Sequence, residues 1–479
     1  MASPAAVGRA WSPEPFEWSD PPRTLPYLPG RVWLAVLVLY VILAVLEPYD
    51  LLSPISGYGM QEHKAEIGAA LDTIQSGNML RRLGVIALCL YGAVAVFLSR
   101  RAERRWIPAI AVPATALFLL AMLSPFWSED PVITVRKVVV LFSLVLAAFG
   151  IARCWNLDTL VRATFVVSGM TILLGMGTEL VLGTMHPLQP DYRFRGSVQP
   201  TAMALYCALF IISSGVLAKR FTGRRSLLMG VLSVAGIGLL LLTKSRGTLF
   251  ALCAAVVVVS LLSLSRRGAV LAVAAIATAV FGAMIFIPDL SARIQLWGSL
   301  GRSNASDLLS MTGRTELFRD LLPFIADRPI FGYGYDSFWQ PVHILEVARL
   351  EGWIVGSSHN QIIGMLLDLG VVGCALFVFL LTASLWTAVT YARRDRTALS
   401  LFPVAILVWS YVNMITFGFW FETTIPAFLP LTLVAHLAIR VPRDVRVRRG
   451  NRSRLDRLAP RELTRVAGGT RKSMVPDVV

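Results

Sequence analysis

The chain has 479 residues, of which 56% are hydrophobic and only 15% are charged, and its mean hydropathy is +0.65. Soluble domains typically carry about 25% charged residues, so this composition excludes a soluble globular protein. Disordered, collagen-like and disulfide-stapled classes are excluded by the apolar majority, the aperiodic glycines and the five cysteines. A polytopic membrane protein remains, and its formal charge of +16 makes the placement of the cations informative.

The first thirty residues contain seven prolines and several acidic residues. They lack the basic start of a cleavable signal and predict a disordered cytoplasmic segment, 1–30. Runs of about 20 apolar residues then predict about twelve transmembrane helices, nine of them within 31–288 and three within 362–440. The predicted spans are 31–47, 83–99, 107–124, 132–152, 161–182, 201–218, 227–243, 247–264, 269–288, 362–390, 399–418 and 424–440.

Lys and Arg are concentrated in every second predicted loop. The basic segments are 100–105, 153–162, 219–225, 266–267, 393–396 and the tail after 440. Because cytoplasmic loops carry the excess of Lys and Arg, both termini are predicted to be cytoplasmic and the other loops to face outward. The tail, 441–479, is strongly basic; an anchor to anionic membrane lipids is favoured over a nucleic-acid contact.

One outward loop, 289–361, is far longer than the others. Loops of this length in compact proteins usually carry function, and long translocated loops escape the charge rule. No internal repeat relates the two halves of the chain, which weakens a transporter built from duplicated bundles. The histidines are scattered and no cysteine pair has metal-ligand spacing, so no metal or cofactor is predicted.

Three groups of cations lie in segments that are predicted to face outward, where the charge rule makes them rare. They are Arg193 and Arg195, Lys244 and Arg246, and Arg314 in a Gly-Arg-Thr-Glu motif that ends at Glu316. Snorkelling or helix capping would explain any one of them. Several guanidinium groups converging at the outer leaflet could instead hold a lipid diphosphate without a metal.

Four further residues are candidates for chemistry or for binding. His359 could act as a base towards an acceptor hydroxyl, although it and Asn360 could equally cap the next helix. Tyr335 belongs to an aromatic segment that could stack on sugars, but packing and membrane anchoring are favoured. Glu422 lies between two apolar spans, where an ion pair is the simpler interpretation and a substrate contact the alternative.

The order of these motifs resembles the O-antigen ligase and polymerase superfamily, most closely its exopolysaccharide polymerase branch. The resemblance rests on five short segments and covers roughly residues 130–430. They are Arg195-Gly196, Ser245-Arg246-Gly247, Gly313-Arg314-Thr315-Glu316, Pro329-Ile330-Phe331-Gly332-Tyr333-Gly334, and Ser358-His359-Asn360 followed by Leu367-Asp368-Leu369-Gly370-Val371-Val372-Gly373. The glycine and aromatic residue that usually follow His-Asn are replaced by Gln361 and Ile362.

The resemblance implies an all-α, lipid-carrier-type (GT-C-like) glycosyltransferase of the bacterial inner membrane, with its active site facing the periplasm. It implies that Arg246 and Arg314 contact the diphosphate, that Arg195 is a further outer-face arginine and that His359 is essential. The expected substrate is undecaprenyl-diphosphate-linked oligosaccharide, transferred to another repeat unit with inversion and without a metal. Membrane lipids are the other expected partners, and a chain-length regulator is left open.

Two alternatives remain at this stage. A ligase would move finished polymer onto a lipid A core, and a polytopic transporter of lipid-linked sugar or another solute would carry out no transfer chemistry. A purely structural membrane scaffold is disfavoured by the costly outward arginines.

Overall fold

The computed structural model describes residues 30–46, 79–99, 105–189, 192–265, 267–268, 271, 314–351 and 355–440. Within these residues, nine helices are long and apolar enough to cross a membrane, and two shorter apolar helices accompany them. The eleven are α1 (Gly30–Leu46), α3 (Met79–Leu98), α4 (Pro108–Leu123), α5 (Pro131–Cys154), α6 (Leu157–Val181), α7 (Pro200–Arg220), α8 (Arg224–Leu242), α9 (Arg246–Ser263), α14 (Gln361–Asp395), α15 (Ala398–Thr416) and α16 (Ile425–Ala438).

These helices correspond one to one to eleven of the twelve predicted spans, with ends that differ by a few residues. The remaining predicted span, 269–288, lies outside the described residues except for Leu271, as do the tails 1–29 and 441–479. The protein is therefore an all-α polytopic membrane protein, as the apolar runs predict.

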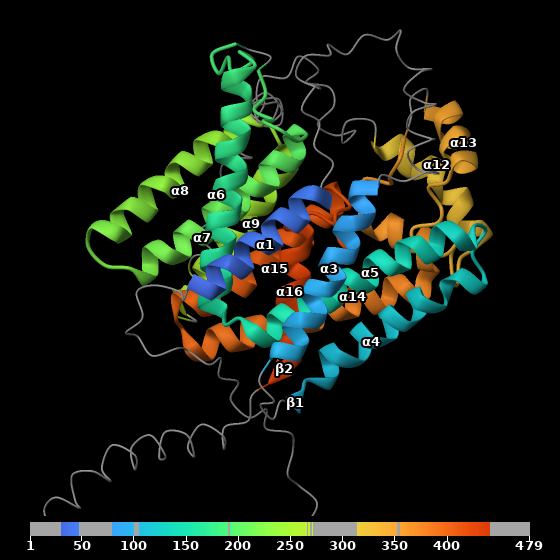
Figure 1. Cartoon of the computed structure of the whole chain (residues 1–479), viewed down its shortest axis with the longest axis horizontal. Helices are drawn as coiled ribbons and strands as arrows, with labels where there is room; N and C mark the ends of the chain where they lie inside the picture. Colours follow the sequence, from blue (N-terminus) through green and yellow to red (C-terminus); the bar gives the residue numbers. More distant parts are fainter. Residues whose placement is uncertain are drawn as a thin grey trace, which may run out of the picture.

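The bundle is built around α7 and α15, in each of which 72% of the apolar window is buried by other helices. Figure 1 shows α3, α5 and α14 on one side of the bundle and α6, α7, α8 and α9 on the other. Long apolar side chains on the outer face of α8, such as Leu227 and Val234, are 70% and 68% exposed. Exposure of this kind is expected where a helix meets lipid instead of protein.

One end of the bundle is fastened by charged and backbone contacts. Asp158 at the start of α6 forms ion pairs with Arg162 and with Arg220 at the end of α7, at 3.0 and 2.8 Å. A short antiparallel pairing joins β1 (Arg105–Trp106) to β2 (Ile439–Arg440), at the bottom of Figure 1. The arginines at this end belong to the loops that the charge rule assigns to the cytoplasm.

The opposite end carries the second part of the predicted long loop. It contains α12 (Arg314–Asp327) and α13 (Pro341–Glu351), at the upper right of Figure 1. Their apolar faces share a small core of their own. Its buried members are Leu317, Leu321, Tyr333, Phe338, Val347, Val355 and Leu367.

This loop is joined to the membrane helices by an interruption in α14. Gly370 has φ 64° and ψ −164°, so it leaves the helical conformation and frees backbone groups on both sides. The segment 329–334 satisfies them: Tyr333 N donates to Leu367 O at 2.7 Å, and Val371 N donates to Pro329 O at 2.8 Å. In a membrane protein such freed groups need protein partners, so the break and the loop segment depend on each other.

We expect Gly370→Ala to destabilise the folded protein strongly. An alanine at positive φ is strained, by about 1–3 kcal/mol, and its Cβ would lie 2.2 Å from the carbonyl oxygen of Ile330. Gly238→Ala in α8 is the matched control, because nothing lies within 4 Å of the added Cβ. Thermal unfolding of the detergent-purified variants measures the difference, and equal midpoints for the two would contradict the role given to Gly370.

Candidate functional site

The loop with the first outward arginines is held between two helices. Phe194 is fully buried and its backbone N–H donates to Leu242 O at the end of α8, at 2.9 Å. Arg193 Nε donates to Thr243 O at 3.2 Å. Two segments that lie some fifty residues apart in the sequence therefore meet, and they bring Arg193 and Arg195 to the break that contains Lys244.

The break between α8 and α9 is short and closely bonded to α15. Lys244 adopts the left-handed conformation, with φ 53°, and Arg246 is the first residue of α9. Ser245 Oγ contacts Thr248 Oγ1 at 3.2 Å, and Thr248 Oγ1 contacts Asn413 Oδ1 at 3.4 Å. A cation at a helix N-terminus opposes the helix dipole, so the position of Arg246 favours a negatively charged ligand.

His359 lies in a turn that is hydrogen-bonded to α15, the helix that also contacts the break between α8 and α9. Asn360 caps α14, because its Oδ1 accepts from Ile362 N at 2.9 Å and from Ile363 N at 3.3 Å. Its Nδ2 donates to Ile415 O near the end of α15, at 3.2 Å. The side chain of Asn360 is thus occupied by structure, and the capping role considered for this segment is confirmed for Asn360.

The His359 side chain contacts its own turn. Its Nδ1 lies 3.3 Å from Ser357 Oγ, and the side chain is half-buried. The residue has φ 49°, a backbone angle that is uncommon for residues other than glycine. Gln361 Oε1, one residue later, accepts from Trp420 N at 3.1 Å and so joins the turn to the connection between α15 and α16.

Backbone strain gathers at these same segments. Five described residues other than glycine have positive φ, and three of them are Lys244, His359 and Phe421. Glu422 follows Phe421 and is exposed at the turn. Strained residues persist where the surrounding structure determines them fully, and they concentrate at functional sites.

The hydrogen bonds described above join four connections into one region. These connections are 193–196, 243–246, 357–361 and 417–424, and we call the region the outer-end site.

Three predicted residues are not joined to the outer-end site by these bonds. Arg314 begins α12, and its side chain lies outside what the structure describes. Glu316, in the first turn of α12, is exposed. Tyr335 is only 7% exposed and its N–H donates to Ser124 Oγ at 3.0 Å. Burial, with nearby carboxylates, raises the pKa of Tyr335 well above its ordinary value, so the phenol stays neutral within the core.

The favoured interpretation of the aromatic segment, packing, is confirmed by the structure. Tyr333 and Phe338 are 3% and 0% exposed, and their rings meet edge to face at 5.2 Å. Burial and the neighbouring Asp327 raise the pKa of Tyr333 to about 12. The Tyr333 hydroxyl therefore remains a donor, and it reaches Asp327 Oδ2 at 3.2 Å.

Lys137 of α5 forms an ion pair with the long loop. Its Nζ pairs with Asp336. The sequence could not indicate this partner, because the two residues are 199 positions apart.

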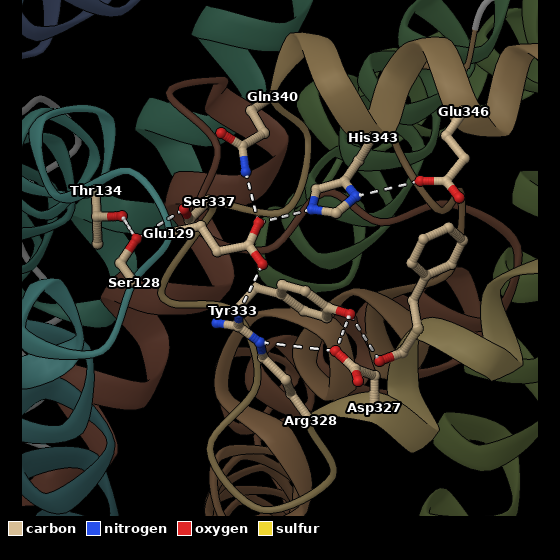
Figure 2. Close-up of polar contacts among 11 residues, drawn as sticks. Ser128, Glu129, Thr134, Asp327, Arg328, Tyr333, Ser337, Gln340, His343 and Glu346 are labelled. Atoms are coloured by element: carbon tan, nitrogen blue, oxygen red, sulfur yellow. Dashed lines mark hydrogen bonds and ion pairs between the residues drawn. The ribbon is translucent and has the colours of Figure 1, made fainter.

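Sequence reasoning also missed the carboxylate that docks the long loop, Glu129, between α4 and α5. It accepts from Arg328 at 2.7 Å and from both Gln340 and His343 at 2.8 Å, as Figure 2 shows. Glu129 stands next to Asp130 and Pro131 at a predicted span boundary, a place that reads as a simple helix start. Only contacts across more than 190 residues reveal its role.

We expect Glu129→Ala to loosen the docking of α12 and α13, because three donors lose their shared acceptor. Partial exposure of the pair with Arg328 limits the cost to about 1–2 kcal/mol. Trypsin cleavage at Arg319, which is 76% exposed on α12, should become faster. Glu346→Ala is the control, since Glu346 is 55% exposed and contacts His343 only at 3.9 Å. Equal cleavage rates for the two variants would refute the docking role.

Within the described residues, no group of three or more His, Cys, Asp or Glu side chains is arranged to hold a metal ion.

Comparison with known proteins finds two similarities. A family model described as O-antigen ligase matches residues 231–378, which include the α8–α9 break, the long loop and the His359 turn. The chain is 27% identical over 321 residues to the exopolysaccharide production protein ExoQ of Rhizobium meliloti. That alignment covers 61% of this chain and 69% of the relative.

The matched region contains Lys244, Arg246, Arg314 and His359, so most residues on which the resemblance rests lie within it. This similarity supports a glycosyltransferase-type membrane enzyme with a polymerase or ligase role in surface polysaccharide biosynthesis. Lipid-linked saccharides are the substrates that the similar family suggests. The chain is thus similar to the O-antigen ligase family over residues 231–378 and, over 61% of its length, to an exopolysaccharide production protein.

Proposed function

We propose that the protein polymerises a bacterial surface polysaccharide, transferring an oligosaccharide from undecaprenyl diphosphate to the end of another repeat unit. The observation that carries this proposal is the hydrogen-bonded union of the Arg193–Arg195 loop, the Lys244–Arg246 break and the His359 turn at one end of the bundle. The segments that carry the cations and a potential base come from three distant parts of the chain, and these bonds attach them to the ends of α8 and α15.

The cations would hold the diphosphate. Guanidinium groups stay charged and bind phosphate oxygens through two parallel hydrogen bonds, which suits Arg195, Arg246 and Arg314 for this task. Arg193 and Lys244 would add positive charge, and charge growing on the departing diphosphate would be stabilised by all of them. Glu316 and Glu422 are proposed as contacts for the sugar or its acceptor, because both carboxylates are exposed. We leave Tyr335 out, since its ring is buried.

His359 is the proposed general base. The acceptor hydroxyl oxygen would form a bond to the anomeric carbon while the bond from that carbon to the diphosphate breaks, so the diphosphate leaves with the electron pair. The hydroxyl proton would pass to His359 Nε2, with Nδ1–H donating to Ser357 Oγ. This single displacement inverts the anomeric centre and calls for no metal.

The proposed orientation follows from the cations at the other end of the bundle. Arg162, Arg220 and the arginines near β2 would face the cytoplasm, which puts both termini inside and the outer-end site in the periplasm. The proposed layout is a tail at 1–30, helices within 31–288, a periplasmic segment at 289–361, helices within 362–440 and a basic tail at 441–479. The basic tail is suited to anionic lipids or to a protein that controls chain length.

A ligase is the second candidate, because the matching family model is described as O-antigen ligase. The relative named as an exopolysaccharide production protein favours the polymerase. Deletion of the gene separates them: loss of a polymerase leaves single repeat units on the lipid carrier, whereas loss of a ligase leaves long polymer there.

We expect His359→Ala to lower transfer by about 10²–10⁴-fold and Arg246→Ala by about 10²–10³-fold. The measurement is elongation of undecaprenyl-diphosphate repeat unit by purified protein in EDTA. His186→Ala is the control, because His186 is an exposed residue between α6 and α7. Full activity of His359→Ala would remove it as the base, and loss of wild-type activity in EDTA would refute the metal-free mechanism.

Two helix caps give a second test of the site. Asn156 caps α6 through Thr159 N at 2.8 Å, far from the outer-end site, whereas Asn360 caps α14 beside His359. Replacing either by alanine should cost about 1 kcal/mol of stability. We expect only Asn360→Ala to lower transfer by an amount beyond this loss of stability, because its turn holds His359. Equal activities of the two variants, measured alongside their unfolding midpoints, would contradict this.

A further inference from the structure

The loop that carries Arg193 and Arg195 is hydrogen-bonded to a buried carboxylate, Glu179, near the end of α6. Glu179 is 1% exposed. Its Oε1 accepts from the backbone N–H groups of Arg195 at 2.9 Å and Gly196 at 2.8 Å. Its Oε2 accepts from the Tyr192 hydroxyl. Three donors from five consecutive residues thus converge on one side chain, and this carboxylate has no part in the mechanism described above.

The loop packs directly against α6, and no side chain fits between the two backbones at Gly196. Gly196 has φ 60°, and a Cβ on it would lie 2.5 Å from Gly175 Cα. Gly175 is one helical turn before Glu179, so the loop lies directly on α6 at both points. On its other side the loop is bonded to Leu242 O and Thr243 O. The backbone of Arg195 is therefore fixed between two helices.

Tyr192 supports the same arrangement. Burial, followed by its hydrogen bond to Glu179, raises the pKa of the Tyr192 phenol above its ordinary value. The hydroxyl therefore keeps its proton near neutral pH and remains a donor to the carboxylate.

We infer that Glu179 is a positioning residue of the transferase: it fixes the backbone of Arg195, and thereby the direction of the guanidinium that binds the diphosphate, without touching substrate. This inference rests on the proposed function. Displacing a binding group by about 1 Å can cost about 10²-fold in rate, so a buried acceptor that is hydrogen-bonded directly to the backbone N–H of Arg195 is well placed to control affinity.

The test measures binding of undecaprenyl diphosphate to the purified protein in nanodiscs, with Kd and the number of binding sites determined separately. We expect Glu179→Ala to raise Kd by about ten- to a hundred-fold with one site per folded molecule retained. A merely structural role would reduce the number of competent sites and leave Kd unchanged. Glu179→Gln should retain most of the affinity, because its amide oxygen can still accept the two backbone N–H bonds.

The decisive comparison is a double-mutant cycle with Arg195→Ala. If Glu179 acts through Arg195, the double variant binds no more weakly than Arg195→Ala alone, whereas independent roles give additive losses. Thr178→Ala is the matched control, since its hydroxyl bonds only to Leu174 O within α6. Tyr192→Phe removes one of the three donors and should raise Kd in the same direction by less than Glu179→Ala.

The outcomes separate the inference from the proposed function. Unchanged Kd in Glu179→Ala, or additive losses in the cycle, would overturn the role of Glu179 while leaving the transferase intact. Binding without any transfer by the wild type would overturn the proposed chemistry alone, and absence of wild-type binding would overturn both. If Glu179→Ala does not fold, Tyr192→Phe is the deciding variant. An unchanged Kd in that variant refutes the positioning role of Glu179.

Discussion

The interruption of α14 at Gly370 is the constraint on which the outer half of the protein depends. A helix that breaks inside a membrane protein exposes backbone groups that lipid cannot satisfy. Here the segment 329–334 supplies their partners, so the long loop is built into the bundle at this point. Glu129, Lys137 and Trp127 then attach the same loop to the corner between α4 and α5. The loop is thereby placed over one end of the bundle as a packed unit with its own core.

A second set of bonds organises the outer-end site beside it. Asn360 is bonded to α15 through Ile415, Thr248 to the same helix through Asn413, and Arg193 to the end of α8. Two of these bonds, those of Asn360 and Arg193, are made to backbone carbonyls at helix ends, where such groups are available. Since α15 is among the most enclosed helices, it provides a rigid reference for both the His359 turn and the Arg246 break. Precise placement of charged groups on rigid elements is what electrostatic catalysis needs.

Charge is divided unequally between the two ends. At one end, cations are paired with Asp158 inside the structure or lie in basic loops. At the other, carboxylates such as Glu129 and Glu179 are used to hold loops, and the arginines of the outer-end site lie between helix ends. A buried carboxylate that accepts backbone N–H groups fixes a loop without needing a long partner side chain, which is why Glu179 can hold Arg195 by its backbone.

The sequence by itself determined the membrane class, eleven of the helices and the resemblance to a family, because runs of about 20 apolar residues and short motifs are local features that need no partner. It also singled out Arg195, Arg246 and His359 as candidate site residues. Only the tertiary structure decided that Tyr335 is packed away, that Lys137 pairs with Asp336, and that Glu129 and Glu179 hold the loops. From sequence alone, a lone carboxylate or lysine at a span boundary is interpreted as a helix cap or a snorkelling group. Its real partner lies up to two hundred residues away and is chosen by how the helices pack.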